Sequence, residues 1–496
     1  MIALRGVCFS YGTSDSAPGA VPGKGAARDP VLKDINLRIE TGECVVLTGR
    51  SGNGKTTLTR VINGLAPSYY GGSLAGEVLI DGKPLGAMPS WERARVLGNV
   101  FQDPQSQFFS GELAGEIAFA CENLGFPLAE IRRRTDGVIR DMNLDSLRRA
   151  PLDRLSSGAM QKAAIASVRS VSPDIYVFDE PSANLDEGSS WRLAEIVSAL
   201  KQQGHTLIIA EHRLSYLMDT ADRIVYLDQG SITAEYSPAE LRGLSAPGLR
   251  ALGLRSPERI EAPRLPSPAE EAERGDREPA IEARDLSYRA KANTILAGVS
   301  LRGFPGMIAA VTGRNGVGKT TLGKILCGLL RERGGKVLIR GKPAKPGKRL
   351  SAVWRGANNT GAQFLAHSAA EELLLLSPRS GEELERAGAV LKGLGLHEYR
   401  NAHPETLSGG QKQRLSLACG VFSGRDICIF DEPTSGLDGE GLVMVSRCLR
   451  EMARAGKTIF IITHDAELIR ECCTHCIALD GLRPPHGPGW VSGDAL

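Results

Sequence analysis

The chain has few aromatic residues and almost no excess charge of either sign. Phe, Trp and Tyr make up 5% of its 496 residues, and the formal net charge is +3. Proteins that bind nucleic acid by base stacking and phosphate contacts need aromatic residues interleaved with a basic surface. This composition makes a nucleic-acid partner the weaker hypothesis.

Long apolar runs are also absent. The most apolar stretches, such as Cys44 to Leu47 and Leu207 to Ala210, have the length of strands, whereas a membrane-spanning helix needs about 20 apolar residues. The first residues show no charged region followed by an apolar stretch, so no signal peptide is predicted. If this protein acts at a membrane, we expect another chain to supply the membrane part.

The cysteines form no disulfide pattern. Ten are scattered along the chain, which is typical of a protein in a reducing compartment. Cys472, Cys473, His475 and Cys476 are clustered, but no second pair of ligands follows at a defined distance. A helix end that runs into a buried strand is favoured there over a metal site.

The same series of signals occurs twice in the same order. GRSGNGKTT is followed later by GRNGVGKTT, and IYVFDEP by ICIFDEP. Glu180 recurs as Glu432 and His212 as His464, with an identical offset. An internal duplication of this length sets the fold, because each copy repeats a whole folding unit. We therefore predict a first domain at 1–244, a second domain at 280–496 and a Pro-rich, Glu-rich and Arg-rich linker at 245–279.

Both glycine-rich stretches match the phosphate-binding pattern G-x-x-x-x-G-K-T. Each follows an apolar run typical of a strand and precedes an amphipathic stretch typical of a helix. Glycine lets the backbone N–H groups wrap phosphates where side chains would crowd them. Lys55 and Lys319 are expected to meet the β- and γ-phosphates, and Thr56 and Thr320 to offer hydroxyls to Mg²⁺. The predicted nucleotide-binding residues of the two loops are Gly49, Arg50, Ser51, Gly52, Asn53, Gly54, Lys55, Thr56 and Thr57, with Gly313, Arg314, Asn315, Gly316, Val317, Gly318, Lys319, Thr320 and Thr321.

Two apolar strands end in a pair of carboxylates. Asp179 and Asp431 are predicted to lie near Mg²⁺, and the adjacent Glu180 and Glu432 to polarise a water toward the γ-phosphate. A strand cap with solvated acids is the alternative. His212 and His464 each end a further apolar run, and their repeated position favours a γ-phosphate contact over a purely structural role.

The sequence LSGGQKQR runs from Leu407 to Arg414. It is expected to form the start of a helix whose first backbone amides bind an anion. Together with the loops and carboxylates, it makes the chain resemble the ATP-binding-cassette ATPases over nearly its whole length. The resemblance implies two P-loop NTPase domains in tandem, α/β in class, each with a mixed sheet core and a helical signature subdomain. It also implies ATP hydrolysis with Mg²⁺, and nucleotide held between the glycine loop of one domain and the signature of another.

The family assigns further roles by resemblance. Ser408, Gly409, Gly410 and Gln411 match the signature that contacts nucleotide, and Ser156 and Gly158 match its altered first copy. Tyr11 and Tyr288 match the residue that stacks on adenine, with a buried strand tyrosine as the alternative reading.

A finer resemblance lies in NVFQDPQSQFFSGELAGEIAFACENLG, from Asn99 to Gly125. This segment is similar to the Q-loop of the energy-coupling-factor importers for vitamins and transition metals. The likeness implies that Gln102 senses Mg²⁺ and the attacking water, and that the following loop docks a transmembrane coupling subunit. A membrane substrate-binding subunit would complete the complex, with this chain peripheral on the cytoplasmic face of the cell membrane.

Two departures from the family pattern make the domains unequal. The first signature reads Leu155-Ser156-Ser157-Gly158-Ala159, and Asn358 replaces the second Q-loop glutamine. We expect the domains to pair within the chain, so that both departures fall on one nucleotide site. A soluble tandem ATPase acting on ribosomes or nucleic acid, and a fused sugar-importer ATPase, remain alternatives.

Overall fold

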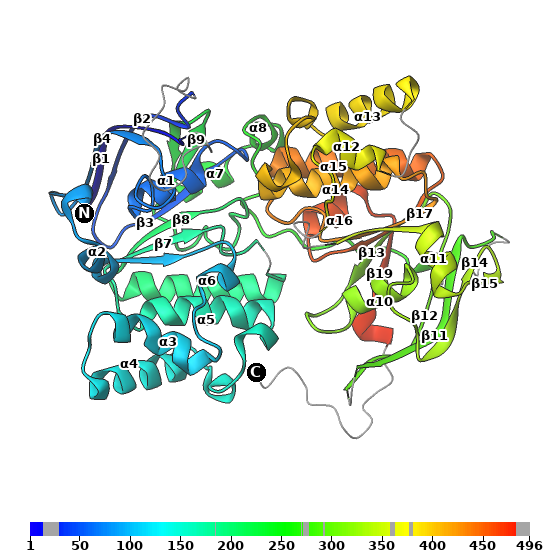
Figure 1. Ribbon diagram of the computed structural model, residues 1–496, viewed down its shortest axis with the longest axis horizontal. Coiled ribbons are helices and arrows are strands. Elements are labelled where there is room, and N and C mark those ends of the chain that lie inside the picture. The colour runs from blue at the N-terminus through cyan, green and yellow to red at the C-terminus, as the bar shows by residue number, and fades with distance from the viewer. Residues whose placement is uncertain are drawn as a thin grey trace. The chain divides into compact units, whose positions relative to one another are not determined.

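The structure is a computed structural model, and it describes residues 1–12, 29–183, 185–268, 270, 277–290, 293–357, 363–375 and 380–482. The chain divides into two units, Met1–Arg259 and Ile260–Val491, called unit 1 and unit 2 below. The two units share most of their order of strands and helices (Figure 1), as the internal duplication predicts.

Unit 1 contains two sheets. One is antiparallel, in the order β2-β1-β4-β5, and the other is mainly parallel, in the order β10-β9-β3-β8-β7-β6, with β10 antiparallel to β9. The strands are β1 (Ile2–Ser10), β2 (Leu32–Ile39), β3 (Cys44–Gly49), β4 (Ser73–Ile80), β5 (Lys83–Pro84), β6 (Leu97–Val100), β7 (Ile175–Asp179), β8 (Thr206–Ala210), β9 (Arg223–Asp228) and β10 (Ser231–Tyr236).

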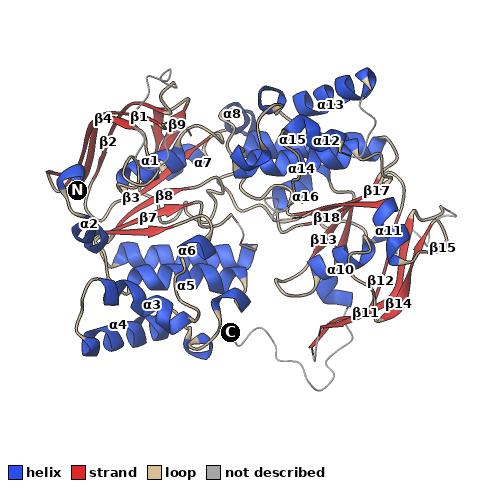
Figure 2. Ribbon diagram, viewed as in Figure 1, coloured by secondary structure: helices blue, strands red, loops and turns tan. Residues whose placement is uncertain are grey.

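Three α-helices of unit 1 lie between β6 and β7 and form a helical subdomain (Figure 2). Another helix follows the glycine loop, and the remaining helices lie before β6 or after β7. The α-helices are α1 (Lys55–Ile62), α2 (Ser90–Val96), α3 (Leu113–Asn123), α4 (Leu128–Asp141), α5 (Ser157–Arg169), α6 (Glu187–Gln202), α7 (Pro238–Arg242) and α8 (Ala246–Ala251). Short 3₁₀ turns are η1 (Leu85–Ala87), η2 (Pro104–Gln107), η3 (Asp145–Leu147) and η4 (Leu152–Arg154).

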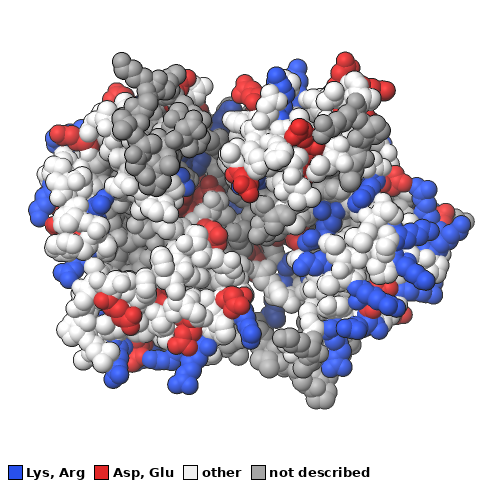
Figure 3. Space-filling model, viewed as in Figure 1, with Lys and Arg blue, Asp and Glu red and all other residues white. Residues whose placement is uncertain are grey.

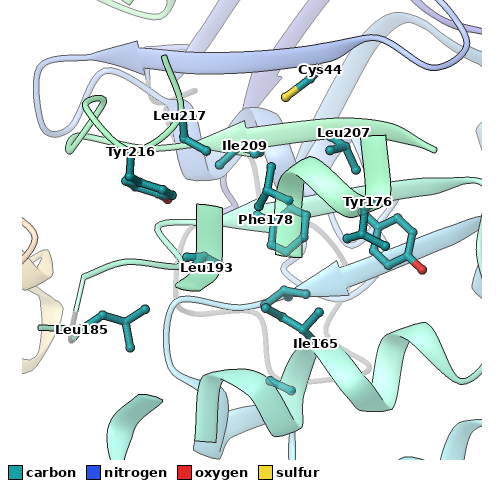
Figure 4. Packing of buried hydrophobic residues seen from close by; sticks show 14 of the residues in the cluster. Cys44, Ile165, Tyr176, Phe178, Leu185, Leu193, Leu207, Ile209, Tyr216 and Leu217 are labelled. Atoms are coloured by element: carbon teal, nitrogen blue, oxygen red, sulfur yellow. The ribbon is translucent and has the colours of Figure 1, made fainter. Parts of the chain in front are cut away.

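The central strands of unit 1 are buried on both faces, so their side chains pack into two separate cores. Along β7, Tyr176 and Phe178 join the core shared with α5 and α6, while Ile175 and Val177 join the core on the other face. Figure 4 shows the first of these, where Phe178 lies among residues of β8, α5 and α6. Continuous apolar strands are the pattern of a parallel sheet covered on both sides.

Unit 2 repeats this plan. Its antiparallel sheet has the order β12-β11-β14-β15, and its parallel sheet the order β16-β17-β18-β13-β19. The strands are β11 (Ile281–Ala290), β12 (Asn293–Gly303), β13 (Ile308–Thr312), β14 (Gly334–Ile339), β15 (Lys342–Pro343), β16 (Val353–Gly356), β17 (Ile427–Asp431), β18 (Thr458–Ile462) and β19 (His475–Ala478). The helices are α10 (Lys319–Leu326), α11 (Pro346–Ala352), α12 (Ala369–Leu374), α13 (Gly381–Gly393), α14 (Gly409–Phe422), α15 (Gly439–Arg454) and α16 (Ala466–Cys472), with 3₁₀ turns η6 (His397–Tyr399), η7 (Pro404–Thr406) and η8 (Leu479–Leu482).

The predicted boundary of the first domain at residue 244 is too early. Helix α8 lies inside the segment expected to be a linker, and Leu254 is buried in the core of unit 1. Arg50 Nη2 also donates to the Ala251 carbonyl at 2.7 Å. The apolar residues of this Pro-containing and Gly-containing stretch pack on unit 1, so the unit continues to Arg259.

Candidate nucleotide sites

The glycine loop of unit 1 joins the carboxyl end of β3 to the start of α1. Gly49 has φ +141°, and a Cβ atom there would lie 2.1 Å from the Leu227 carbonyl oxygen. Gly54, the N-cap of α1, has φ +94°. These conformations and this close approach require glycine. The first amides of α1 then face the loop, as an anion-binding helix start requires.

Lys55 lies across its own loop. Its Nζ donates to the carbonyls of Gly49 and Arg50, both at 3.0 Å, and its side chain is 4% exposed. The ammonium therefore sits at the centre of the loop, where a bound phosphate would be. In unit 2, Lys319 Nζ makes the corresponding contacts with Gly313 and Arg314.

The loop helix meets the carboxyl end of β7 through one hydrogen bond. Thr56 Oγ1 donates to Asp179 Oδ1 at 2.9 Å. Burial raises the pKa of Asp179, while the Thr56 hydrogen bond and the charges of Arg60 and Lys55 oppose that rise. A hydroxyl and a carboxylate held together beside a phosphate loop are the hard oxygen donors that Mg²⁺ prefers. The residues present in unit 1 therefore fit that ion.

Glu180 lies between two of the predicted catalytic residues. Gln102 Nε2 donates to Glu180 Oε2 at 2.8 Å, and His212 Nε2 is 3.6 Å from Glu180 Oε1. Glu180 has φ +43°, and its counterpart Glu432 has φ +48°. Such a conformation costs a non-glycine residue free energy and is held by its surroundings, often at functional sites.

His212 is an uncharged imidazole at neutral pH. Burial, followed by the charges of Lys55 and Arg255, lowers the pKa of His212 well below 6.5. Its Nε2 is 3.5 Å from Ser51 Oγ in the glycine loop. His212 Nε2 therefore lies close to both the glycine loop and Glu180 without adding a positive charge.

Glu211 holds this region together, and our sequence analysis did not identify it. Its buried carboxylate accepts hydrogen bonds from the Ser182 hydroxyl at 2.8 Å, the Tyr216 hydroxyl at 2.9 Å and the His212 backbone N–H at 2.8 Å. The available signal was an acidic residue at the end of the apolar run LIIAEH. In unit 2, Thr463 takes this sequence position and its hydroxyl donates to Glu432 Oε2 at 3.0 Å.

Unit 2 differs most at its strand-end carboxylate. Thr320 Oγ1 donates to Asp431 Oδ2 at 3.1 Å, as in unit 1, but Arg355 Nη2 also donates to that oxygen at 3.0 Å. Burial raises the pKa of Asp431, and Arg355 is the largest opposing influence. In the sequence, this interaction could have been suspected only from Arg355, a basic residue inside the short strand β16.

The same hydrogen bond occurs after β6 and after β16. Gln107 Oε1 accepts from the Phe101 N–H, and Gln363 Oε1 accepts from the Ala357 N–H, both at 3.1 Å. This repeat supports the alignment of Gln102 with Asn358. Asn358 itself lies outside the described residues.

The signature segments differ at their helix starts. Ser408 caps α14 in a capping box with Gln411, whereas Ser156 caps α5 through the Ala159 N–H without a reciprocal side chain. Ala159 cannot reach back as glutamine does. A Cβ at Gly409 would meet nothing within 4 Å, while unit 1 places the Ser157 side chain at this position. The surface expected to face nucleotide is therefore bulkier in unit 1.

The two predicted adenine-stacking tyrosines are both half-buried. Tyr11 OH lies 3.1 Å from Thr57 Oγ1 and accepts from Arg60 Nη1 at 3.1 Å, which places it beside the loop helix. Tyr288 lies on β11 and packs at the edge of the unit 2 core. Their role toward adenine stays a prediction.

The cysteine cluster lies where α16 runs into β19, as favoured from sequence. Cys472 Sγ donates to the Leu468 carbonyl, and Cys476 Sγ is 3.4 Å from Thr312 Oγ1. Within the described ranges, no group of three or more His, Cys, Asp or Glu is placed to hold a metal ion. Nor does any helix in this part of the chain have the length and apolarity to cross a membrane.

A strand, a glycine loop and a helix, with a buried lysine and a threonine bonded to a strand-end aspartate, define a P-loop nucleotide-binding unit, and this chain has two. It matches the ABC transporter family over residues 32–183 and 296–435. The chain therefore belongs to that family, as an ATPase with two ATP-binding cassettes in tandem.

Several known proteins resemble the whole chain. A "Putative ABC transporter ATP-binding protein" of Treponema denticola is 37% identical over 487 residues, covering 97% of this chain and 96% of the relative. A "Putative HMP/thiamine import ATP-binding protein" of Bacillus subtilis is 30% identical over 467 residues, covering 89% and 85%. The structure of ribosome-bound archaeal Pelota and ABCE1 contains a chain with TM-score 0.62 and 23% identity, covering 89% and 73%. That last likeness concerns the fold alone.

Proposed function

We propose that this chain is the energy-coupling ATPase of an importer of the energy-coupling-factor type. It would hydrolyse ATP with Mg²⁺ on the cytoplasmic face of the cell membrane and drive solute import through separate transmembrane and substrate-binding subunits. The similarity to the Bacillus subtilis protein that is named for HMP/thiamine import supports this proposal.

The observation that carries the proposal is an exposed aromatic residue, Phe109, on the loop that follows Gln102. Phe109 is 74% exposed and stacks on Phe119, with ring centroids 4.9 Å apart. Only a short loop separates it from Gln102, which holds Glu180. An exposed aromatic residue on a defined loop is a typical anchor for a partner protein.

That loop is fixed rather than loosely attached. Glu116 Oε2 accepts the N–H groups of Phe109 and Ser110, both at 2.8 Å. Unit 2 repeats the arrangement with Glu372, which accepts the N–H groups of Leu365 and Ala366. Leu365 is 82% exposed. A partner that displaces either loop would thereby move the residues beside the nucleotide.

The chemistry follows from the unit 1 residues. Lys55 and the loop amides would neutralise the phosphates, and Mg²⁺ beside Thr56 and Asp179 would stabilise charge developing on the phosphate oxygens. Glu180 would orient the attacking water, with Gln102 fixing the carboxylate. Neutral His212 can donate one hydrogen bond toward the γ-phosphate without competing for it as a charge.

We further propose that the two nucleotide sites are unequal. In the family arrangement, the unit 1 loop would work with the intact signature at Ser408, and the unit 2 loop with the altered signature at Ser156 and Ser157. The first site would hydrolyse ATP, and the second would mainly bind it. Serine at position 157 adds a side chain where the backbone should approach phosphate closely.

One observation favours a second candidate, an ATPase acting on ribosomes or nucleic acid. Figure 3 shows Lys and Arg gathered over the part of unit 2 that carries β11, β14, β15 and α11. The exposed basic residues there include Arg284, Lys336, Arg340, Lys342 and Lys348. Such a face would attract a polyanion.

Co-purification from cells separates these candidates. The importer proposal expects isolation with membrane proteins, and Phe109→Ser should weaken that association. Leu128→Ser is the matched control, because Leu128 is 62% exposed but lies at the start of α4 rather than on the loop. Sedimentation with ribosomes, combined with no effect of Phe109→Ser, would contradict the importer proposal.

A further inference from the structure

Arg355 forms a buried ion pair with the unit 2 strand-end carboxylate. The arginine and Asp431 side chains are 9% and 4% exposed, and Nη2 is 3.0 Å from Oδ2. Thr320 donates to the same oxygen. The oxygen that should lie nearest a divalent cation therefore already accepts hydrogen bonds from a hydroxyl and a guanidinium.

The position is neutral in unit 1. Arg355 on β16 pairs with Ile429 of β17, and the corresponding pair on β6 and β7 is Asn99 with Val177. Asparagine carries no charge, so it forms no ion pair with Asp179, which accepts from Thr56 and is influenced by the charges of Arg60 and Lys55. The two sites therefore differ in that a guanidinium binds the strand-end carboxylate directly in unit 2.

The helix that follows the glycine loop has a glycine close to the arginine. Gly323 in α10 takes the place of Thr59 in α1, and a Cβ there would lie 3.7 Å from Arg355 Nε and 3.1 Å from Ile462 Cδ1. A threonine adds two more heavy atoms beyond Cβ, and these would need the space beside the guanidinium. Glycine inside a helix is destabilising, and at this position it leaves space for both Ile462 and Arg355.

The electrostatic consequence is direct. A guanidinium remains protonated at every physiological pH. In a buried site it repels a divalent cation placed against the same carboxylate, and it attracts the negative phosphates that the cation would otherwise neutralise. The donor set that suits Mg²⁺ in unit 1 is therefore unsuited to it in unit 2.

We propose that unit 2 holds nucleoside triphosphate without a divalent cation, with Arg355 as the permanent positive charge beside Asp431. This inference rests on the proposed inequality of the two sites and explains it chemically. Without a metal to polarise the γ-phosphate, the nucleotide bound by unit 2 would be retained rather than hydrolysed.

Photolabelling of the intact, unaltered chain with 8-azido-ATP tests the idea, with mass spectrometry locating the label in unit 1 or unit 2. In EDTA, labelling of unit 1 should fall by at least about tenfold relative to Mg²⁺, the scale on which metal sites respond to a lost contact. Labelling of unit 2 should change little. Equal losses in both units would overturn the proposal.

Mn²⁺ supplies a readout that does not depend on turnover. Electron paramagnetic resonance of the chain saturated with a non-hydrolysable ATP analogue should give one tightly bound ion per chain. Arg355→Asn, which copies the unit 1 residue, should raise this to two and make unit 2 labelling sensitive to EDTA. Two ions in the unaltered chain would contradict the inference.

The reverse substitution is the matched control. Asn99→Arg should lower Mn²⁺ binding by unit 1, while Thr59→Gly alone should not, and a thermal melt would verify that each variant is folded. None of these measurements involves a membrane partner, so failure of the importer proposal and failure of this inference remain distinguishable.

Discussion

Replacing Glu180 with glutamine preserves the size of the side chain and removes its charge. The carboxylate is positioned by Gln102 at 2.8 Å and has neutral His212 3.6 Å away, and we expect it to act as a base toward water. A positioned base contributes about 10² to 10⁴ in rate, equivalent to roughly 2.7–5.4 kcal/mol of barrier. Glu180→Gln should therefore nearly abolish turnover.

The matched variant is Glu432→Gln in unit 2. There Glu432 accepts from the Thr463 hydroxyl, and the adjacent Asp431 is paired with Arg355. If unit 2 mainly binds nucleotide, this change should lower turnover by less than about tenfold.

Phosphate release at saturating ATP measures both variants, and nucleotide affinity measured separately shows that binding is intact. Equal losses of turnover would refute the reasoning, since they would mean that both glutamates serve hydrolysis alike. A large loss from Glu432→Gln alone would assign hydrolysis to the other unit.

Three further predictions concern the same framework. Gly49→Ala places a Cβ 2.1 Å from the Leu227 carbonyl, so it should lower the melting temperature and abolish ATP binding by unit 1, measured by calorimetry and photolabelling. The folded-state pKa of His212 lies below the usual 6.5, so below about pH 6.5 the unfolded chain binds a proton that the folded chain does not. The free energy of unfolding should therefore fall as pH drops through about 6.5. In urea titrations, His212→Asn should weaken this pH dependence. Ser408→Ala removes the capping box of α14 and should lower the free energy of unfolding by about 1 kcal/mol. Ser156→Ala is the comparison, and an unchanged free energy of unfolding in both variants would contradict this account.

Much of the site could be predicted from sequence, because its parts are local. A glycine loop needs consecutive residues of fixed backbone conformation, and the pattern from Gly49 to Thr57 states them directly. The strand-end pair Asp179 and Glu180 is equally local, and both recur in unit 2. The predicted end of the first domain at residue 244 was wrong, because the packing of Leu254 on unit 1 depends on contacts with distant residues.

The sequence alone therefore determined the duplicated α/β architecture and the family, since these follow from motifs that are contiguous in the chain. Only the tertiary structure revealed that Arg355 reaches Asp431 and that Glu211 binds Ser182 and Tyr216. Arg355 and Asp431 lie on the neighbouring strands β16 and β17, and Ser182 and Glu211 follow the neighbouring strands β7 and β8, so the order of strands in each sheet decides which of them meet. The charge next to each strand-end carboxylate depends on these contacts, so the difference between the two units could be seen only in the tertiary structure.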